Sequence, residues 1–370
     1  MKISLRTNSG IALIIAMIAI TVLSILAAGL WYAMKVETRL AQNADSETQL
    51  YWLGRSGVEY ARWILSQQAL IAGEPYDSLN QKWAGGPGTD AESNSVLAGI
   101  SLDNYPVGDG TVSLKIIDLE RKINVNTASP DVLQQALTAM GVDADSISVV
   151  SDSIQDWIDT DDSPRLAGAE SDYYQTLTPP YYAKNAPIDD LSELLLIKGV
   201  TPEMYDPETY GGSNAPSPFQ HKLGFGNSPG QAPDYPFGLK DIFTPVSTGR
   251  VNINTADTNV LQALLGVDAS VAAAIVQQRA GPDGLDGTED DTPIRNVQSA
   301  LQSAGVNQLA SRRFGGPLTT RSSTFEVHVT AKIGDYSREY IAILYRASSM
   351  DIKVFSFYWK EVSNSGNPPD

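Results

Sequence analysis

An uncharged apolar run near the N-terminus constrains this chain more than any other feature. No Asp, Glu, Lys or Arg occurs between Ile11 and Ala33, and the run begins directly after Gly10, the last residue of a short basic leader. A helix that rises about 1.5 Å per residue would cross a hydrocarbon core of roughly 30 Å over this length. We therefore expect a leader over residues 1–10 and one membrane span over residues 11–33.

The helical pattern continues beyond the predicted span. No proline follows Arg39 until Pro75, and apolar residues recur there at the three- and four-residue spacing of an amphipathic helix. We expect one helix from about Ile11 to Gln68, on the order of 85 Å long. Its second half, residues 34–70, would then pack under a soluble head.

A secretory signal is the alternative interpretation of this run. Such a signal has an apolar core of about 7 to 15 residues and ends at a small-residue cleavage site. The segment "LAAGL" around Ala28 leaves this possibility open, although the length of the run fits it less well. Lys2 and Arg6 precede the span, and Lys35 and Arg39 follow it together with Glu37, so the charge bias across the span is small. With the acidic remainder placed outside, it favours a cytoplasmic N-terminus and a bulk on the periplasmic or exterior side.

The rest of the chain has the composition of an acidic globular protein. Its hydrophobic fraction is 42%, and 43 acidic residues against 26 basic ones give a formal charge of −17. This balance disfavours nucleic acid, because phosphate binding requires Lys and Arg. There is no cysteine, which excludes disulfides, thiolate metal sites and cysteine nucleophiles. The two histidines, His221 and His328, offer little material for a metal centre or a catalytic relay.

Strand patterns occur on both sides of a long middle segment. Val112, Leu114 and Ile116 alternate with polar residues, and three β-rich runs follow near the end: "TFEVHVTAKI", "REYIAILYRA" and "IKVFSFYWKEV". We expect an α+β fold in which the long helix packs on a small antiparallel sheet formed by residues 71–123 and 318–370. A helical insertion over residues 124–317 would interrupt this sheet.

The predicted insertion contains a repeat. The segments "KINVNTASPDVLQQAL", from Lys122, and "RVNINTADTNVLQALL", from Arg250, align without gaps at a constant offset of 128 residues. Each has an Asn-x-Asn-Thr turn, a predicted capping residue (Ser129 or Asp257) and an apolar-periodic helix. We expect one repeat over about 122–200 and one over about 250–310, and a degenerate third copy in "DDLSELLLIKGVTPEMY" from Asp189.

The repeated turn and helix resemble the helix-hairpin-helix motif of DNA-binding proteins and related SAM-like domains. That motif holds a phosphate through backbone N–H groups of a Gly-rich hairpin. Here the hairpins read "MGVDAD" and "LGVDAS", so Asp143 and Asp268 occupy positions where a second glycine is wanted. Because a carboxylate repels phosphate, we interpret the repeats as a scaffold for packing and partner contact.

Two dense acidic loops lie in the insertion, and each is a candidate calcium site. Several carboxylates in one ordered loop repel one another unless a hard cation neutralises them, although neither loop matches the EF-hand pattern. A solvated acidic surface is the open alternative. Gly284 and Gly287 make the second loop the preferred site, because they let backbone carbonyls fold around an ion. The first loop supplies Asp156, Asp159, Asp161, Asp162, Glu170 and Asp172, and the second supplies Asp283, Asp286, Glu289, Asp290 and Asp291.

The N-terminal features together resemble those of type IV pilins and type II secretion pseudopilins. This resemblance implies that a membrane aspartyl peptidase, the prepilin peptidase, cuts after Gly10 and methylates the new amine of Ile11. Glycine suits such a site, because a residue without a side chain lets the backbone lie extended and close to the catalytic carboxylates.

One position departs from that family's common pattern. Most members carry glutamate at the fifth mature residue, where it can pair with the N-terminal amine of a neighbouring subunit, whereas this chain has Ile15. A subunit without that carboxylate avoids burying an unpaired charge when it has no such neighbour, which suits the first subunit at a filament tip. Alternatively, Ile15 is simply another lipid-facing residue of an anchor.

Four features together resemble the minor pseudopilin K family of type II secretion systems. They are the N-terminus without glutamate, the insertion of nearly 200 residues, and the segments "WIDTDDSPRLAGAESDYY" and "LSELLLIKGV". The resemblance covers nearly the whole chain. It implies a non-enzymatic cap on the pseudopilus tip, formed with the minor pseudopilins I and J above the major pseudopilin and supporting export of folded proteins. It also implies a single-pass inner-membrane anchor, a periplasmic bulk and calcium in the helical domain.

Two rival classes of function remain open. A membrane-anchored helix-hairpin-helix DNA-binding protein of a competence or type IV pilus system would need positive charge on the repeats. A membrane-anchored hydrolase would need paired carboxylates in a cleft, and the sequence contains no phosphate loop, nucleophile elbow or metalloprotease motif. The Pro- and Gly-rich segment 201–248 is expected to be a long loop or a flexible lid.

Overall fold

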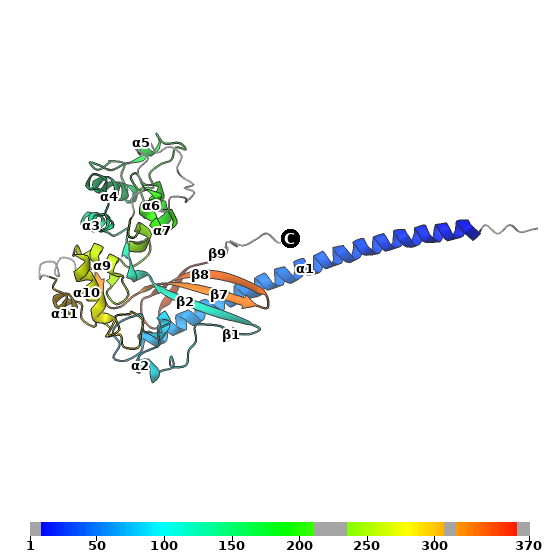
Figure 1. Ribbon diagram of the computed structural model, residues 1–370, viewed down its shortest axis with the longest axis horizontal. Coiled ribbons are helices and arrows are strands. Elements are labelled where there is room, and N and C mark those ends of the chain that lie inside the picture. Colours follow the sequence, from blue (N-terminus) through cyan, green and yellow to red (C-terminus); the bar gives the residue numbers. More distant parts are fainter. Residues whose placement is uncertain (1–8, 211–234, 307–315, 361–370) are drawn as a thin grey trace, which may run out of the picture.

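The helix α1 (Ser9–Ala69) is the longest element of the molecule, with 61 residues and a length of about 90 Å. The computed structural model describes residues 9–210, 235–306 and 316–360. In this part of the chain, α1 alone is long and apolar enough to cross a membrane, and its apolar segment is fully exposed. The helix extends far beyond the folded body (Figure 1), as the uncharged apolar run and its proline-free continuation predict.

A five-stranded antiparallel sheet packs against the C-terminal part of α1. The strand order is β1-β2-β7-β8-β9, and the central pair β2–β7 runs from Thr111 opposite Lys332 to Asp118 opposite Phe325. The strands are β1 (Tyr105–Val107), β2 (Gly110–Asp118), β7 (Thr324–Ile333), β8 (Tyr336–Arg346) and β9 (Ile352–Lys360). The predicted alternation is confirmed, since Val112, Leu114 and Ile116 are buried. One hydrophobic core joins this face of the sheet to α1.

Two glycines let α1 approach the sheet closely. A Cβ atom on Gly54 would lie 2.4 Å from Cδ2 of Tyr340, and one on Gly57 would lie 2.3 Å from Cγ1 of Val329. Real Cβ atoms do not approach other atoms so closely, so a larger residue at either position would push the helix off the sheet.

Replacing Gly57 with alanine is expected to lower the free energy of unfolding by up to about 2 kcal/mol. Overpacking costs roughly 1–3 kcal/mol and outweighs the gain of about 1 kcal/mol in helix propensity. Chemical denaturation of the detergent-solubilised chain measures the effect. Gly99→Ala is the matched control, because no atom lies within 4 Å of its added Cβ, and it should change stability by less than about 0.5 kcal/mol. Equal effects of the two variants would contradict this packing.

The residues between β2 and β7 form a second, mainly helical unit with its own hydrophobic core. Its strands pair in parallel as β3–β4 and β5–β6. In chain order its elements are η2 (Leu119–Arg121), β3 (Ile123–Asn124), α3 (Pro130–Met140), α4 (Ala144–Ile158), α5 (Ser171–Tyr174), η3 (Leu191–Leu196), α6 (Pro202–Tyr205), α7 (Pro207–Tyr210), α8 (Leu239–Ile242), β4 (Phe243–Thr244), β5 (Val251–Asn252), α9 (Thr258–Leu265), α10 (Ala269–Arg279), α11 (Val297–Ser303) and β6 (Leu318–Thr319). Two short helices, η1 (Lys82–Ala84) and α2 (Asp90–Ser93), connect α1 to the sheet.

The two copies of the sequence repeat adopt the same local structure. In the first, Asn126 Oδ1 accepts from Ile188 N at 2.7 Å and Asn126 Nδ2 donates to Ile188 O at 2.9 Å. In the second, Asn254 makes the same two bonds to Ile294, at 2.8 and 2.9 Å. The helices that follow the two turns, α3 and α9, pack against each other. The second asparagine of each turn therefore ties its own copy to a segment much later in the chain.

These bonds revise two details of the predicted repeat. The segment from Asp189 is not a third copy, because it directly follows Ile188 and forms the closing half of the first copy, as residues 293–306 do in the second. The side chain of Ser129 caps α3 as predicted, whereas Asp257 makes no such bond to α9. The Asp257 carboxylate instead accepts from Arg121 Nη2 at 3.0 Å.

The Pro- and Gly-rich segment also differs from the expected loop where it is described. Its two ends carry α6, α7, α8 and β4, and Met204, Phe237 and Leu239 are buried in the core of the helical unit. Residues 211–234 lie outside the described residues, as do most of the predicted leader (1–8), the end of the second repeat (307–315) and the end of the sheet unit (361–370).

Candidate metal site in the inserted domain

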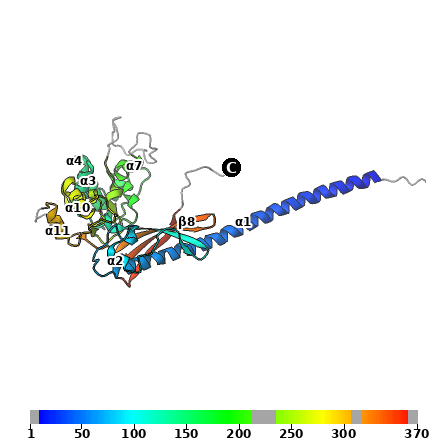
Figure 2. The ribbon, with the colours of Figure 1, turned by 60° about the horizontal axis from the view of Figure 1, so that its bottom comes forward.

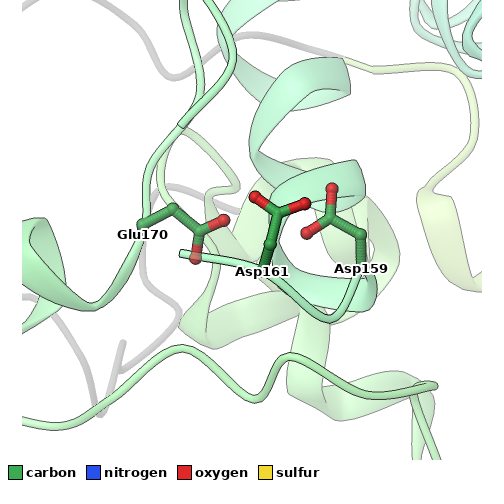
Figure 3. Close-up of side chains that lie close together, drawn as sticks. All are labelled: Asp159, Asp161 and Glu170. Carbon is green, nitrogen blue, oxygen red and sulfur yellow. The ribbon is translucent and has the colours of Figure 1, made fainter. Parts of the chain in front are cut away.

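Three carboxylates of the first acidic loop converge on one point. Asp159 ends α4, Asp161 follows two residues later, and Glu170 precedes α5. One oxygen from each of the three lies within 4.8 Å of the others, and Figure 3 shows the three side chains pointing toward one another. The single loop that connects α4 to α5 therefore supplies all three carboxylates.

Glu170 is the least satisfied member of this cluster. Glu170 is 3% exposed, and neither of its carboxylate oxygens has a hydrogen-bond partner among the described residues. Burial, followed by the charges of Asp156 and Asp159, raises the pKa of Glu170 to about 7. A buried carboxylate without a donor is costly unless a proton or a cation neutralises it.

Two further buried oxygens without partners lie in the same loop region. They are Oδ1 of Asp159 and Oδ1 of Asn185. The other oxygen of Asp159 accepts from Arg165 Nη1 at 2.5 Å, while Asn185 Nδ2 donates to the backbone oxygen of Asp161 and to Asp162 Oδ1 at 3.0 and 3.1 Å. Sequence reasoning missed Asn185, because it belongs to no acidic run and reaches the loop only through the fold.

The remaining predicted residues of the first loop stand outside the cluster of three. Asp162 accepts hydrogen bonds from Ser171 Oγ and from Asn185. Asp172 lies in the first turn of α5 and is exposed. Asp156 is fully buried and forms an ion pair with Arg165 at 2.6 Å. These residues shape the loop and add negative charge near it.

The donor set suits a hard cation. Calcium prefers six to eight oxygen ligands from carboxylates, amide and backbone carbonyls and water. The cluster offers carboxylate oxygens of Asp159, Asp161 and Glu170, and the unpartnered Oδ1 of Asn185 belongs to a residue already bonded to the loop. The orphaned oxygens of Glu170 thus fit the demand of such an ion for buried, uncommitted ligands.

The second acidic loop uses its carboxylates differently. Arg279, which is 2% exposed, donates from Nε and Nη2 to the two oxygens of Asp286 at 2.9 and 2.6 Å. Asp290 accepts from the backbone N of Asp283 at 3.0 Å, and Asp291 accepts from Gly287 N at 2.8 Å. The Arg279 guanidinium and backbone N–H groups of the loop therefore already satisfy the carboxylates of Asp286, Asp290 and Asp291.

The geometry of the described residues favours the first loop as a cation site, whereas the expectation preferred the second. Asp283 accepts from Leu285 N and Glu289 is exposed, and within residues 281–292 no three carboxylates offer oxygens as close as those of the first loop. Positive φ angles of 72° and 85° at Gly284 and Gly287 serve the turns of the loop. Glycine content suggested the second loop, but the buried Arg279 occupies Asp286 in place of a metal ion.

The helical hairpins present carboxylates where a phosphate would bind in a helix-hairpin-helix. Asp143 and Asp268 precede the first residues of α4 and α10, and neither side chain caps its helix. Gly141 and Gly266, with φ of 82° and 60°, end the preceding helices. Since each hairpin has an acidic residue at the helix N-terminus, the geometry disfavours an anion there.

The predicted processing site lies at the start of α1. Gly10 and Ile11 are the second and third residues of this helix. Ile15 is 62% exposed, and the other large apolar side chains of the predicted span are exposed as well. The exposed apolar surface of this end requires lipid or neighbouring helices, and Ile15 contributes no charge to it.

Comparisons with known proteins agree on one family. Residues 113–207 match the family model described as type II secretion system (T2SS), protein K. The type II secretion system protein K of Pseudomonas aeruginosa is 24% identical over 98% of this chain and 95% of its own length. The putative protein K of Escherichia coli K12 is 36% identical over 26% of this chain and 33% of its own length.

The fold also matches a solved structure. A chain in the crystal structure of the GspK–GspI–GspJ complex from the type 2 secretion system of enterotoxigenic Escherichia coli superimposes with a TM-score of 0.61 at 19% identity. The match covers 87% of this chain and 99% of that one. The family model and the full-length relative thus make this chain similar to the type II secretion system protein K family, and the superposition shows that it shares the fold of that GspK chain.

Proposed function

We propose that this chain caps the tip of a type II secretion pseudopilus and starts its assembly with other minor pseudopilins. The chain would thereby support export of folded proteins without catalysing a reaction. The observation that carries this proposal is the position of the helical unit. It lies at the end of the sheet farthest from the membrane-spanning half of α1, in both views (Figures 1 and 2).

That position has a consequence for filament growth. In this proposal α1 would insert among the N-terminal helices of neighbouring subunits through apolar packing, and each new subunit would be added from below, on the membrane side. A bulky unit above the sheet would block the place of a subunit on the distal side, while α1 stays free to contact subunits below. The uncharged Ile15 supports the same assignment, because a subunit with no neighbour above it has no amine with which to pair a carboxylate.

The proposed partners follow from the family and from the solved complex. The related GspK chain was crystallised with GspI and GspJ, and we infer the corresponding minor pseudopilins I and J as neighbours of this chain. The major pseudopilin would continue the filament, and the prepilin peptidase would cleave between Gly10 and Ile11 and methylate Ile11. The apolar half of α1 would anchor the chain in the inner membrane, with the bulk in the periplasm.

Gold labelling of assembled pseudopili tests the tip assignment. An epitope on the exposed turn between β8 and β9, near Met350 (94% exposed), would be detected by electron microscopy on filaments sheared from cells. We expect one label per filament, at one end. Labels spaced along the filament would instead make the chain a body subunit.

We further propose that the first acidic loop binds calcium. Asp159, Asp161 and Glu170 would supply carboxylate ligands, and the ion would neutralise a buried charge that otherwise favours protonation. Calcium is plentiful outside the cytoplasm, and the bound ion would fix the loop between α4 and α5. The carrying observation is the pair of orphaned oxygens on Glu170.

Calcium and protons should compete for this loop. Folding raises the pKa of Glu170 from 4.5 to about 7, so the protonated form stabilises the folded state at low pH and this contribution is lost as pH rises through about 7. In calcium-free buffer we expect the Tm to fall between about pH 5 and about pH 8. Millimolar calcium should raise the Tm strongly at the higher pH and little at the lower one.

Glu170→Gln is the matched variant for this measurement. It removes the charge and keeps the shape, so the calcium response should largely disappear and the pH dependence should become weaker. Asp286→Asn is the control in the second loop, where Arg279 already neutralises the carboxylate, and it should keep the full calcium response. A wild-type Tm that does not respond to calcium at either pH would contradict the site.

A further inference from the structure

The free edge of β9 is an unused hydrogen-bonding surface. In the described part of the chain β9 pairs with β8 alone, and alternate residues of an antiparallel strand point their N–H and C=O groups to opposite edges. The strand has nine residues and spans roughly 30 Å. The opposite edge of the sheet is formed by β1, which has only three residues.

Aromatic side chains line both faces of this edge. Phe355, Tyr358 and Trp359 are 61%, 50% and 51% exposed. On one face Phe355 stacks on Tyr345 with ring centroids 5.4 Å apart. The strand contains no proline, and its single irregularity is a bulge opposite Ile343 and Leu344. Soluble proteins usually protect edges with prolines, bulges or inward charges, so a long aromatic edge indicates a partner.

Basic side chains lie along the edge, while Asp189, Asp190 and Glu326 line a pocket with the outer face of β9. Lys353 and Lys360 lie on β9, which contains no acidic residue. On the face toward α1, the guanidinium of Arg55 lies 5.3 Å from the ring centre of Phe357, and that of Arg338 lies 5.0 Å from the ring centre of Trp359. Arg338 and Lys353 also pair with Glu47 and Asp351, at 2.8 and 3.6 Å, so within the described residues Lys360 and Arg55 are the edge cations that form no ion pair.

These features select one kind of occupant. A second copy of this chain paired edge to edge would set lysines against lysines, which is unfavourable. An extended segment with apolar residues and acidic side chains would satisfy the backbone groups, cover the aromatic rings and pair with the cations. Lysines on an edge strand can serve to prevent pairing with other chains. The exposed aromatic residues between Lys353 and Lys360 have no such protective role.

We propose that the β9 edge takes up an extended, acidic and apolar strand of a neighbouring minor pseudopilin, which extends the five-stranded sheet across the subunit boundary. The assignment of the neighbour rests on the proposed function, and the chemistry of the strand rests on β9 itself. The added strand would lie beside β9 as a sixth strand of the sheet.

Hydrogen exchange on the full-length chain in detergent, alone and with the purified I–J heterodimer, tests this proposal. Amides of β9 that point to the free edge should exchange at least about tenfold more slowly in the complex. The variant Lys353→Glu/Lys360→Glu should weaken binding of the heterodimer by about tenfold. Its matched control is Lys115→Glu/Lys332→Glu, which makes the same charge change at exposed residues of β2 and β7 and should bind like the wild type.

The outcomes separate this proposal from the proposed function. A wild-type chain that binds no heterodimer would contradict both the partner assignment and the strand pairing. If the heterodimer binds but the β9 amides exchange as in the free chain, the strand pairing alone is wrong. Equal binding by the two double variants would also overturn it.

Discussion

Replacing Arg346 with methionine is expected to lower the free energy of unfolding by about 3–5 kcal/mol, because it leaves a buried carboxylate without its cation. The Arg346 guanidinium forms an ion pair with Asp77, and their side chains are 4% and 1% exposed. Arg346 also donates to Ser322 O at 2.7 Å and to Leu65 O at 3.3 Å. Urea denaturation of the detergent-solubilised chain, followed by tryptophan fluorescence, measures this loss.

Lys353→Met is the matched control for this variant. Lys353 lies 3.6 Å from Asp351, and the two side chains are 62% and 50% exposed, so water already solvates both charges. Removal of such a surface pair changes stability by about 0–1 kcal/mol. An equal loss of stability in the two variants would contradict a stabilising role of the buried Arg346–Asp77 pair.

The Arg346–Asp77 pair belongs to a buried joint between the sheet and the helical unit. Asp118, at the end of β2, accepts from Thr255 Oγ1 and Ser322 Oγ at 2.6 Å each. Burial, and then the charge of Glu120, raises the pKa of Asp118. Glu120 itself accepts from the backbone of Thr324 at 2.8 Å and of Thr248 at 3.3 Å. The carboxylates therefore fasten the inserted unit to both strands between which it is inserted.

Replacing Gly10 with leucine is expected to abolish cleavage of the leader and, with it, assembly and secretion. A peptidase that attacks an extended backbone needs room next to the cleaved bond, and leucine adds a branched side chain at that point. Electrophoretic mobility of the chain co-expressed with its peptidase reports cleavage, and the amount of exported enzyme in the medium reports secretion.

Gly29→Leu is the control for the leader variant. Gly29 lies in the same apolar half of α1, and no atom lies within 4 Å of its added Cβ. The change keeps the hydrophobic character of the helix, so cleavage should proceed at the wild-type rate. Normal cleavage of the Gly10→Leu chain would show that the peptidase does not use this bond.

The elements defined by local pattern were predictable from the sequence. The run "TFEVHVTAKI" coincides with β7, and the expected helix from Ile11 to Gln68 differs from α1 by two residues at its start and one at its end. The strand keeps a period of two over its whole length, and the helix joins an uncharged apolar run to a proline-free segment with a period of about 3.6. The antiparallel sheet was predicted because alternating strand patterns occur on both sides of the insertion.

The site depended on contacts that local pattern does not encode. Both acidic loops are rich in carboxylates. They differ in whether a basic side chain pairs with the candidate ligands, since Arg279 of α10 donates a hydrogen bond to Asp286 in the second loop. Asn185 approaches the first loop from 24 residues away in the sequence. The interface between the sheet and the helical unit also depends on long-range contacts. Asp118, for example, accepts a hydrogen bond from Ser322, which lies 204 residues later in the sequence. Composition therefore indicated where metal binding was possible, and only the fold showed which oxygens are free.

The mass of the mature N-terminus tests the central claim, that this chain is a processed filament subunit, most directly. The chain is co-expressed with its prepilin peptidase, digested and analysed by mass spectrometry. We expect an N-terminal peptide that begins at Ile11 and carries a methyl group on its amine. An intact Met1, or a new end near Ala28, would contradict the account.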